Sequence, residues 1–171
     1  NIYPTPVIGG VGLIKKLRIP QNHNFKKKNS SIILIGKTFG HLEQSCFLKE
    51  NYSITEGMPP EINLKNEKNN GECLLKLIEK NLILSSHDIS NGGLITALSE
   101  MALNSKFGAK IQKPKKLINL FKYFFGEDQA RYIVEIQIQD LPLAEKILKE
   151  ANIYYENIGF TQEDYFEIEG E

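Results

Sequence analysis

The residues best suited to binding a ligand lie in a polar turn between an apolar run and a helix. The run is residues 82–84, and the turn holds Asp88, Ser90, Asn91, Gly92 and Gly93. Apolar side chains then recur at the spacing of one helix face: Leu94, Ala97, Leu98, Met101 and Ala102. Backbone N–H groups point outward where such a helix begins, and glycines let a ligand approach the main chain. The same pattern also fits an ordinary cap and tight turn, because Asp88, Ser90 and Asn91 can each cap a helix.

A second polar cluster, Glu127-Asp128-Gln129, precedes an apolar run at residues 132–138. Ligand sites of α/β proteins tend to lie at strand ends, so these three residues are also candidates for ligand binding. His41 and His87 have no neighbours at metal-ligand spacing, and residue order alone supports no Ser–His–Asp arrangement. We interpret His87 as a structural histidine rather than a catalyst.

The composition of the 171 residues is that of an ordinary globular protein, with 41% hydrophobic and 25% charged residues. Basic and acidic residues number 21 each, and this balance argues against a nucleic-acid partner, which requires a basic face. No apolar run reaches the length of a transmembrane helix, so no membrane partner is expected. Cys46 and Cys73 are spaced like neither a zinc site nor a disulfide framework, which favours free thiols in the cytoplasm.

The apolar patterning predicts an α/β (α+β) fold with a mixed β-sheet and helices covering at least one face. Residues 32–36 are all apolar, which is typical of a strand buried on both faces. The alternation over residues 131–138 instead predicts a strand with one buried face. Further strands are expected at 82–84, 109–111, 154–160 and 165–169, and helices around 46–48 and at 63–80, 94–102, 117–125 and 141–151. The strand–helix–strand order near the end predicts a right-handed crossover to a parallel neighbour.

The first 31 residues differ in character from the rest. Residues 1–14 contain two prolines and a Gly-Gly-Val-Gly run, and they start without a methionine, so we expect a segment of a longer protein. The glycine run lacks the lysine and the following helix of a phosphate-binding loop. Residues 15–31 are polar and basic, and we interpret them as a linker whose lysines at 26–28 form a solvated loop.

Four motifs together resemble the large synthetase subunit of bacterial, small-type phosphoribosylformylglycinamidine synthase. They span residues 5–12, 40–45, 86–94 and 125–131, in the order of that family and over nearly the whole chain. The wider aminoimidazole ribonucleotide synthase superfamily shares this domain type. The resemblance implies that residues 32–171 are a C-terminal synthase-type domain. Residues 1–14 would be the closing strand of a preceding ATP-binding-type domain, and residues 15–31 would link the two.

The resemblance also implies an activity for the full-length enzyme, a step of de novo purine biosynthesis. ATP phosphorylates the amide oxygen of formylglycinamide ribonucleotide, and ammonia from glutamine displaces the phosphate to give the amidine. The implied cofactors are ATP and Mg²⁺. The implied partners are the remaining domains of the synthase chain, a glutaminase subunit and a small accessory subunit. The catalytic histidine of the family lies in other domains, so this segment is expected to contain no catalytic residue, to require no cofactor and to be inactive alone.

By position, Asp88 and Glu127-Asp128-Gln129 resemble the ligand residues of a first, pseudo-equivalent domain of the family. They would line a pseudo-active site that can hold an auxiliary nucleotide, and Asp88 is the candidate metal ligand. Asn91 stands where the family commonly has aspartate, and Glu43 where it commonly has glycine. We therefore expect Asp88 to be structural. Two classes of function follow: a non-catalytic domain of the ATP-dependent ligase, or a free-standing ligand-binding or scaffold module with the same fold.

Overall fold

The computed structural model describes residues 7–13, 22–103, 105–114 and 118–169. Within these ranges, six strands form one mixed sheet in the order β2-β4-β1-β5-β3-β6. The elements are β1 (Ser30–Ile35), α1 (Cys46–Tyr52), α2 (Leu64–Glu79), β2 (Ser85–Asp88), α3 (Gly93–Leu103), β3 (Phe107–Ile111), α4 (Leu120–Phe125), β4 (Tyr132–Gln137), α5 (Leu141–Glu150), β5 (Tyr155–Glu163) and β6 (Glu167–Ile168). This arrangement confirms the predicted mixed α/β fold.

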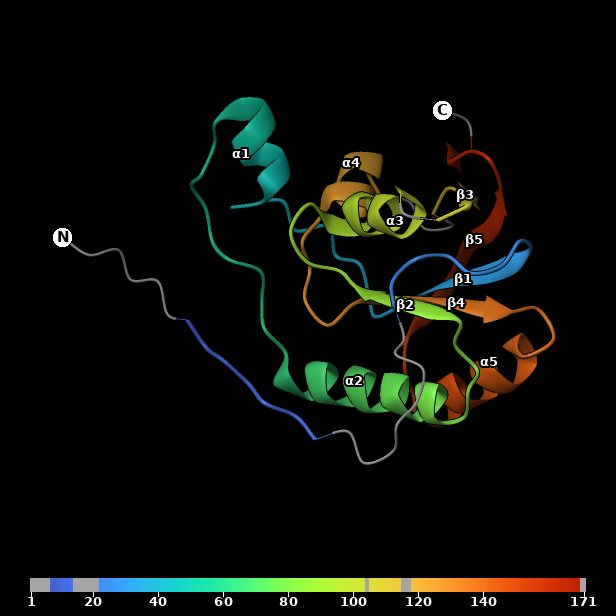
Figure 1. Cartoon of the computed structure of the whole chain (residues 1–171). Helices are drawn as coiled ribbons and strands as arrows, with labels where there is room; N and C mark the ends of the chain where they lie inside the picture. Colours follow the sequence, from blue (N-terminus) through green and yellow to red (C-terminus); the bar gives the residue numbers. More distant parts are fainter. Residues whose placement is uncertain (1–6, 14–21, 104, 115–117, 170–171) are drawn as a thin grey trace.

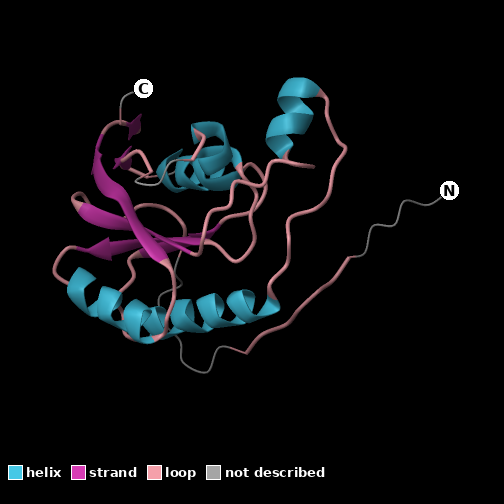
Figure 2. Cartoon of the chain, turned by 180° about the vertical axis from the view of Figure 1, so that it is seen from behind, coloured by secondary structure: helices cyan, strands magenta, loops and turns pink. Residues whose placement is uncertain are grey.

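Helices cover both faces of the sheet, with α3 and α4 on one face and α2 and α5 on the other (Figures 1 and 2). The central strand β1 is buried along its whole length, as its unbroken apolar sequence predicted. Ile32 and Leu34 pack in the core under α3 and α4, whereas Ile33 and Ile35 pack in the core under α2 and α5. Alternate residues of one strand therefore supply two separate hydrophobic cores.

The predicted crossover to a parallel neighbour is wrong in one respect. Strands β4 and β5 both pair antiparallel with β1, so they run parallel to each other, but β1 lies between them. A fully apolar strand is most stable where both of its faces and both of its edges are covered. The strand that comes first in this sheet therefore occupies the space between the two strands that α5 connects.

The prediction of one buried face for β4 is also wrong, because its four central residues, 133–136, are all buried. Ile133 packs under α3 and α4, Val134 and Ile136 pack under α2 and α5, and Glu135 is fully buried. Ile138, predicted to be on the buried face, lies beyond the strand and is exposed. The alternation of polar residues was misleading because the carboxylate of Glu135 finds its hydrogen-bond partners inside the protein.

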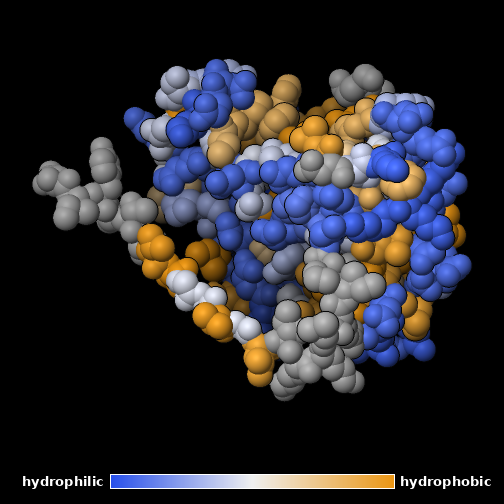
Figure 3. Space-filling model, in the orientation of Figure 1, coloured by the Kyte–Doolittle hydropathy of each residue, from blue (hydrophilic) through white to orange (hydrophobic). Residues whose placement is uncertain are grey.

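Several bounds differ from those expected. The apolar residues Leu82 and Ile83 are buried but precede β2, which starts at the buried Ser85. Helix α4 begins at Leu120, and the expected start at Leu117 lies outside the described residues. Of the segment 1–14 only residues 7–13 are described; they form no regular strand, and Val7, Ile8, Val11 and Leu13 are almost fully exposed. Figure 3 shows this apolar segment projecting from the molecule.

Glu135 joins the start of the domain to the sheet. Its carboxylate accepts hydrogen bonds from the backbone N–H groups of Lys26 (2.8 Å) and Lys27 (3.0 Å) and from the Ser85 hydroxyl (2.8 Å). Phe25, next to these amides, is 3% exposed and packs in the core under α3 and α4. Residues 25–27, predicted to belong to a solvated linker, are thus fixed to the sheet, although the lysine side chains are solvated as expected.

Glu135→Ala is expected to lower the free energy of unfolding by about 3 kcal/mol, because it leaves two partly buried N–H groups and a buried hydroxyl without their acceptor. Urea denaturation measures the change. Glu56→Ala, at an exposed position in the loop between α1 and α2, is the matched control and should leave stability almost unaltered. Equal effects of the two substitutions would contradict the anchoring role of Glu135.

Candidate functional site

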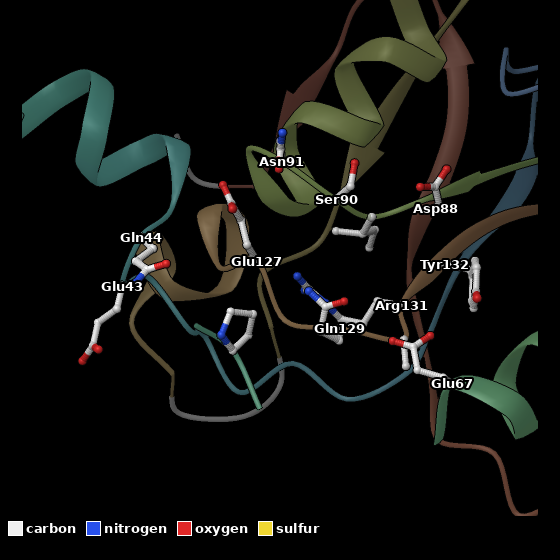
Figure 4. Close-up of a pocket in the computed structure, with 13 residues that line it drawn as sticks. Glu43, Gln44, Glu67, Asp88, Ser90, Asn91, Glu127, Gln129, Arg131 and Tyr132 are labelled. Atoms are coloured by element: carbon white, nitrogen blue, oxygen red, sulfur yellow. The ribbon is translucent and has the colours of Figure 1, made fainter. Parts of the chain in front are cut away.

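A pocket of about 350 Å³ opens where β2 ends and β4 begins. Five of the eight residues predicted from the sequence line it: Asp88, Ser90, Asn91, Glu127 and Gln129. Figure 4 shows them converging from the turn after β2 and from the segment before β4, with Glu43 and Gln44 on one side and Glu67 of α2 on the other. Ile89, Pro60, Ala130, Arg131 and Tyr132 complete the lining.

Glu127 connects two helix starts across the pocket. One of its carboxylate oxygens accepts hydrogen bonds from the N–H of Cys46, the first residue of α1, and from the N–H of Gly92, just before α3, both at 2.8 Å. A carboxylate is stabilising at such positions because helix N-termini carry unpaired donors and partial positive charge. Glu127 therefore holds the turn after β2 against α1.

Asp128 is 5% exposed and does not line this pocket. Its carboxylate accepts the N–H groups of three consecutive residues, Phe39 (3.0 Å), Gly40 (2.9 Å) and His41 (3.1 Å). It also lies on the wall of a neighbouring cleft of about 300 Å³, which shares Pro60, Gln129 and Ala130 with the pocket. Asp128 therefore shapes the loop after β1.

Arg131 is 1% exposed, and its guanidinium joins the segment at 126–131 to the loop after β1. We call these hydrogen-bonded residues the framework of the pocket. Its Nε donates to the Asp128 carbonyl (3.1 Å), Nη1 donates to the Thr38 hydroxyl (3.2 Å), and Nη2 donates to the Gly126 carbonyl (2.5 Å). The Asp128 carboxylate lies 4.0 Å away. Burial lowers the pKa of Arg131, and the charge of Asp128 opposes that shift. The alternation over residues 131–138 predicted that Arg131 lies on an exposed strand face. Its position two residues after the Glu127-Asp128-Gln129 run was the available signal of its burial.

Gly92 and Gly93 follow the lining residue Asn91 in the chain, but neither of them lines the pocket. Both have positive φ, +80° and +73°. A Cβ on Gly93 would meet the carbonyl oxygens of Gly126 (2.7 Å) and Phe124 (2.8 Å), at the end of α4. At Gly93, therefore, the start of α3 closely approaches the end of α4.

The side chains of Asp88, Ser90 and Asn91 were each candidates to cap α3, but they do not accept the N–H groups at its start. The N–H of Gly93 bonds to the Ser90 carbonyl, while the N–H of Gly92 bonds to Glu127. The Asp88 side chain is 71% exposed, and Ser90 and Asn91 are exposed as well. These side chains are thus accessible to a ligand in the pocket.

The pocket is acidic. Glu43, Glu67, Asp88 and Glu127 line it, and among the described lining residues Arg131 is the single cation, with its charge directed into the framework. Burial raises the pKa of the Tyr132 hydroxyl, and the charges of Glu67 and Asp88 add to that shift. Within the described residues, no group of three or more His, Cys, Asp or Glu side chains is placed to hold a metal ion. The lining offers oxygen ligands for a cationic group.

The two predicted non-catalytic histidines have structural contacts. His87 lies 3.0 Å from the Glu100 carboxylate through Nε2, and its Nδ1 lies 2.6 Å from the Asp88 carbonyl. His41 Nε2 lies 2.9 Å from the Met58 carbonyl, in the loop that joins α1 to α2. Neither histidine lines the acidic pocket.

Comparison with known proteins gives both a family and a fold. The family described as AIR synthase related protein, C-terminal domain, matches residues 27–169. The phosphoribosylformylglycinamidine synthase subunit PurL of Pelagibacter ubique is 52% identical over 96% of this chain. The chain spans only 22–23% of the length of the curated relatives it matches.

Solved structures agree in fold at low sequence identity. PurL of Thermotoga maritima complexed with FGAR superposes with a TM-score of 0.70 at 16% identity, over 87% of this chain and 27% of that one. The PurLQS structure from the same organism gives a TM-score of 0.64 at 18% identity, over 88% and 25%. The family match covers the sheet, its helices and every residue of the pocket. The chain therefore belongs to the family of AIR synthase related proteins, and it represents their C-terminal domain.

Proposed function

We propose that this chain is the C-terminal domain of a phosphoribosylformylglycinamidine synthase. The whole enzyme would use ATP and glutamine to convert formylglycinamide ribonucleotide to formylglycinamidine ribonucleotide. The observation that carries this proposal is the 52% identity, over 96% of the chain, with a curated subunit of that name. We place the enzyme in the cytoplasm, in keeping with the free thiols of Cys46 and Cys73.

Within the enzyme, the role of this domain is structural. Glu127, Asp128 and Arg131 direct their polar atoms at backbone groups of the protein, which supports a framework role for the motif at 126–131. The reacting groups belong to the rest of the synthase chain, and ammonia comes from a glutaminase subunit, assembled with a small accessory subunit. Neither nucleic acid nor a membrane is a partner. Among the described residues, no helix has the length and apolar character of a membrane span.

The acidic pocket fits Mg²⁺ only in part. Carboxylate oxygens are the ligands that Mg²⁺ prefers, and Asp88 and Glu67 would hold the ion together with water or phosphate oxygens. When bound, Mg²⁺ would neutralise a phosphate group beside these carboxylates. In the described residues, two carboxylates fall short of a dedicated metal site. We assign ATP and Mg²⁺ to the full-length enzyme and expect this domain by itself to require no cofactor.

A chimaera tests the function. This chain replaces the matching segment of the Pelagibacter ubique enzyme, and the hybrid is expressed in a bacterium that lacks its own synthase. We expect growth without added purines, because the proposed domain has the same contacts to make. The matched control is the Pelagibacter enzyme with that segment deleted, which should not support growth. A folded hybrid that fails to support growth would contradict the proposal.

The purified 171-residue chain is expected to release no ADP above background when given formylglycinamide ribonucleotide, ATP, Mg²⁺ and ammonium. The reason is that the catalytic groups of the proposed enzyme belong to the rest of the synthase chain, and this chain spans only 22–23% of the length of its relatives. A coupled ADP assay measures the rate. Turnover that follows the chain through purification would show that this domain carries the chemistry itself.

Gly92→Val is expected to cost about 1–3 kcal/mol of stability, because a β-branched residue at positive φ is strained. Its Cβ would also collide with Thr96. Asp88→Asn should leave the melting temperature nearly unchanged, since the side chain is 71% exposed. Thermal melts of both variants with and without Mg²⁺ and ADP measure the effects. A stabilisation by Mg²⁺ that Asp88→Asn abolishes would instead make this pocket a true metal-dependent site.

A further inference from the structure

A separate cavity of about 390 Å³ lies at the start of β5, on the other side of β1 from the acidic pocket. Among the described residues, the two cavities share no lining residue. Three tyrosines and two carboxylates stand out in its lining: Tyr123, Tyr154, Tyr155, Glu145 and Glu156. We call this cavity the tyrosine pocket. Its volume lies in the range of sites for small organic molecules.

The carboxylate of Glu156 is oriented by two phenol groups. The Tyr154 hydroxyl donates to one of its oxygens, and the Tyr123 hydroxyl donates to the other at 3.4 Å. Tyr123 is 2% exposed, and burial raises the pKa of its hydroxyl, to which the charge of Glu156 adds. The Tyr123 hydroxyl therefore keeps its proton and remains a donor. Two neutral donors thus fix the carboxylate in position without cancelling its charge.

The charge of Glu156 also has no cationic partner within the described part of the chain, where it belongs to no ion pair. Glu145 differs in this respect, because its carboxylate lies 3.8 Å from Lys149 Nζ. Lys113 lines the pocket as well, but it is exposed and, among the described residues, forms no ion pair with either carboxylate. A half-buried carboxylate in a concave site is stabilised by a ligand that brings the positive charge.

The aromatic walls determine which kind of cation fits. Lys37 Nζ lies 5.9 Å from the centroid of the Tyr154 ring, so this ring already attracts one ammonium group. Tyrosine rings favour an ammonium group and the carbon chain attached to it, whereas Mg²⁺ and Ca²⁺ require several oxygen ligands. Gln112 and Asn157 line the pocket too, and their amide oxygens can accept further N–H groups.

We propose that the tyrosine pocket binds a primary alkylammonium ion. Its N–H groups donate to the Glu156 carboxylate, and its carbon chain lies against the tyrosine rings. Such hydrogen bonds are charge-assisted on both sides and are among the strong ones in proteins. The site lies outside the acidic pocket, and this inference does not rest on the proposed function.

Titration of the 171-residue chain with butylammonium chloride tests the proposal. The backbone amide signals of Tyr155, Glu156 and Asn157 are followed by NMR, with sodium chloride keeping the ionic strength constant. We expect saturable shifts with a dissociation constant on the order of 1 mM, since so small a ligand has few atoms to contribute. 1-Butanol has the same carbon chain without the charge, and it should bind at least about tenfold more weakly.

Three variants locate the site. Glu156→Gln keeps the size of the side chain but removes its charge, and it should weaken butylammonium binding about tenfold. Glu163→Gln is the matched control, because Glu163 lies on the same strand, exposed and outside the pocket, and the affinity should not change. Lys113→Gln removes a like charge from the lining and is expected to strengthen binding by about twofold.

Equal binding of 1-butanol and butylammonium would overturn the proposal, in favour of a pocket for uncharged apolar chains. Shifts that do not saturate would also overturn it, because they indicate non-specific contact with the surface. Unchanged affinity in a folded Glu156→Gln variant would do the same. The comparison of the two ligands uses the native chain, so it decides the matter even where Glu156→Gln fails to fold. No readout involves ATP or synthase activity, and the proposed function and this site therefore fail independently.

Discussion

The guanidinium of Arg131 is almost fully excluded from water, and the site depends on the three hydrogen bonds that it donates. An isolated buried cation costs several kcal/mol, so its surroundings must be arranged to compensate it. The compensation comes from its own motif, through the carbonyls of Gly126 and Asp128, and from the Thr38 hydroxyl. Arg131 therefore fixes the path of residues 126–131 beside the loop that follows β1.

That path directs the two adjacent carboxylates in different directions. Asp128 turns toward three backbone N–H groups of the loop after β1, and Glu127 turns toward the starts of α1 and α3. Segments that are 35 to 89 residues apart in the chain thus meet at one motif. The acidic pocket is the space that remains between them, and its shape follows from hydrogen bonds within the framework. The exposed carboxylate of Asp88 and the half-buried carboxylate of Glu67 also line it.

The sequence was sufficient for features that depend on local patterns. The unbroken apolar run gave β1, helical spacing gave α2, α3 and α5, and the glycine pair gave the sharp turn into α3. It was insufficient where buried polar groups have distant partners. Glu135 and Arg131 look like exposed residues of an alternating strand, because their partners at residues 26–27 and 38 lie more than 90 positions away. The position of β1 between β4 and β5 was missed for a related reason, since strand order depends on which strand best tolerates full burial.

The candidate site was found in outline because its residues lie at strand ends, yet their roles could not be read from the sequence. Asp128, Gly92 and Gly93 were expected at a ligand, and the contacts described for them are with groups of the protein itself. Turn residues such as glycine and aspartate serve both purposes equally well. A carboxylate that accepts hydrogen bonds from the backbone is a framework residue, whereas one that faces the pocket can bind a ligand. This difference is visible only in the structure.

Amide hydrogen exchange at Phe39, Gly40 and His41 tests the central claim most directly, that the motif at 126–131 is a framework. These amides lie in a loop, where N–H groups ordinarily exchange fast, but here each donates to Asp128. We expect slow exchange at all three amides in the native chain and fast exchange in Asp128→Ala, which removes both acceptor oxygens, with the amides of β1 still protected. Fast exchange at these three amides in the native chain would contradict it, because Asp128 would then be free to bind a ligand.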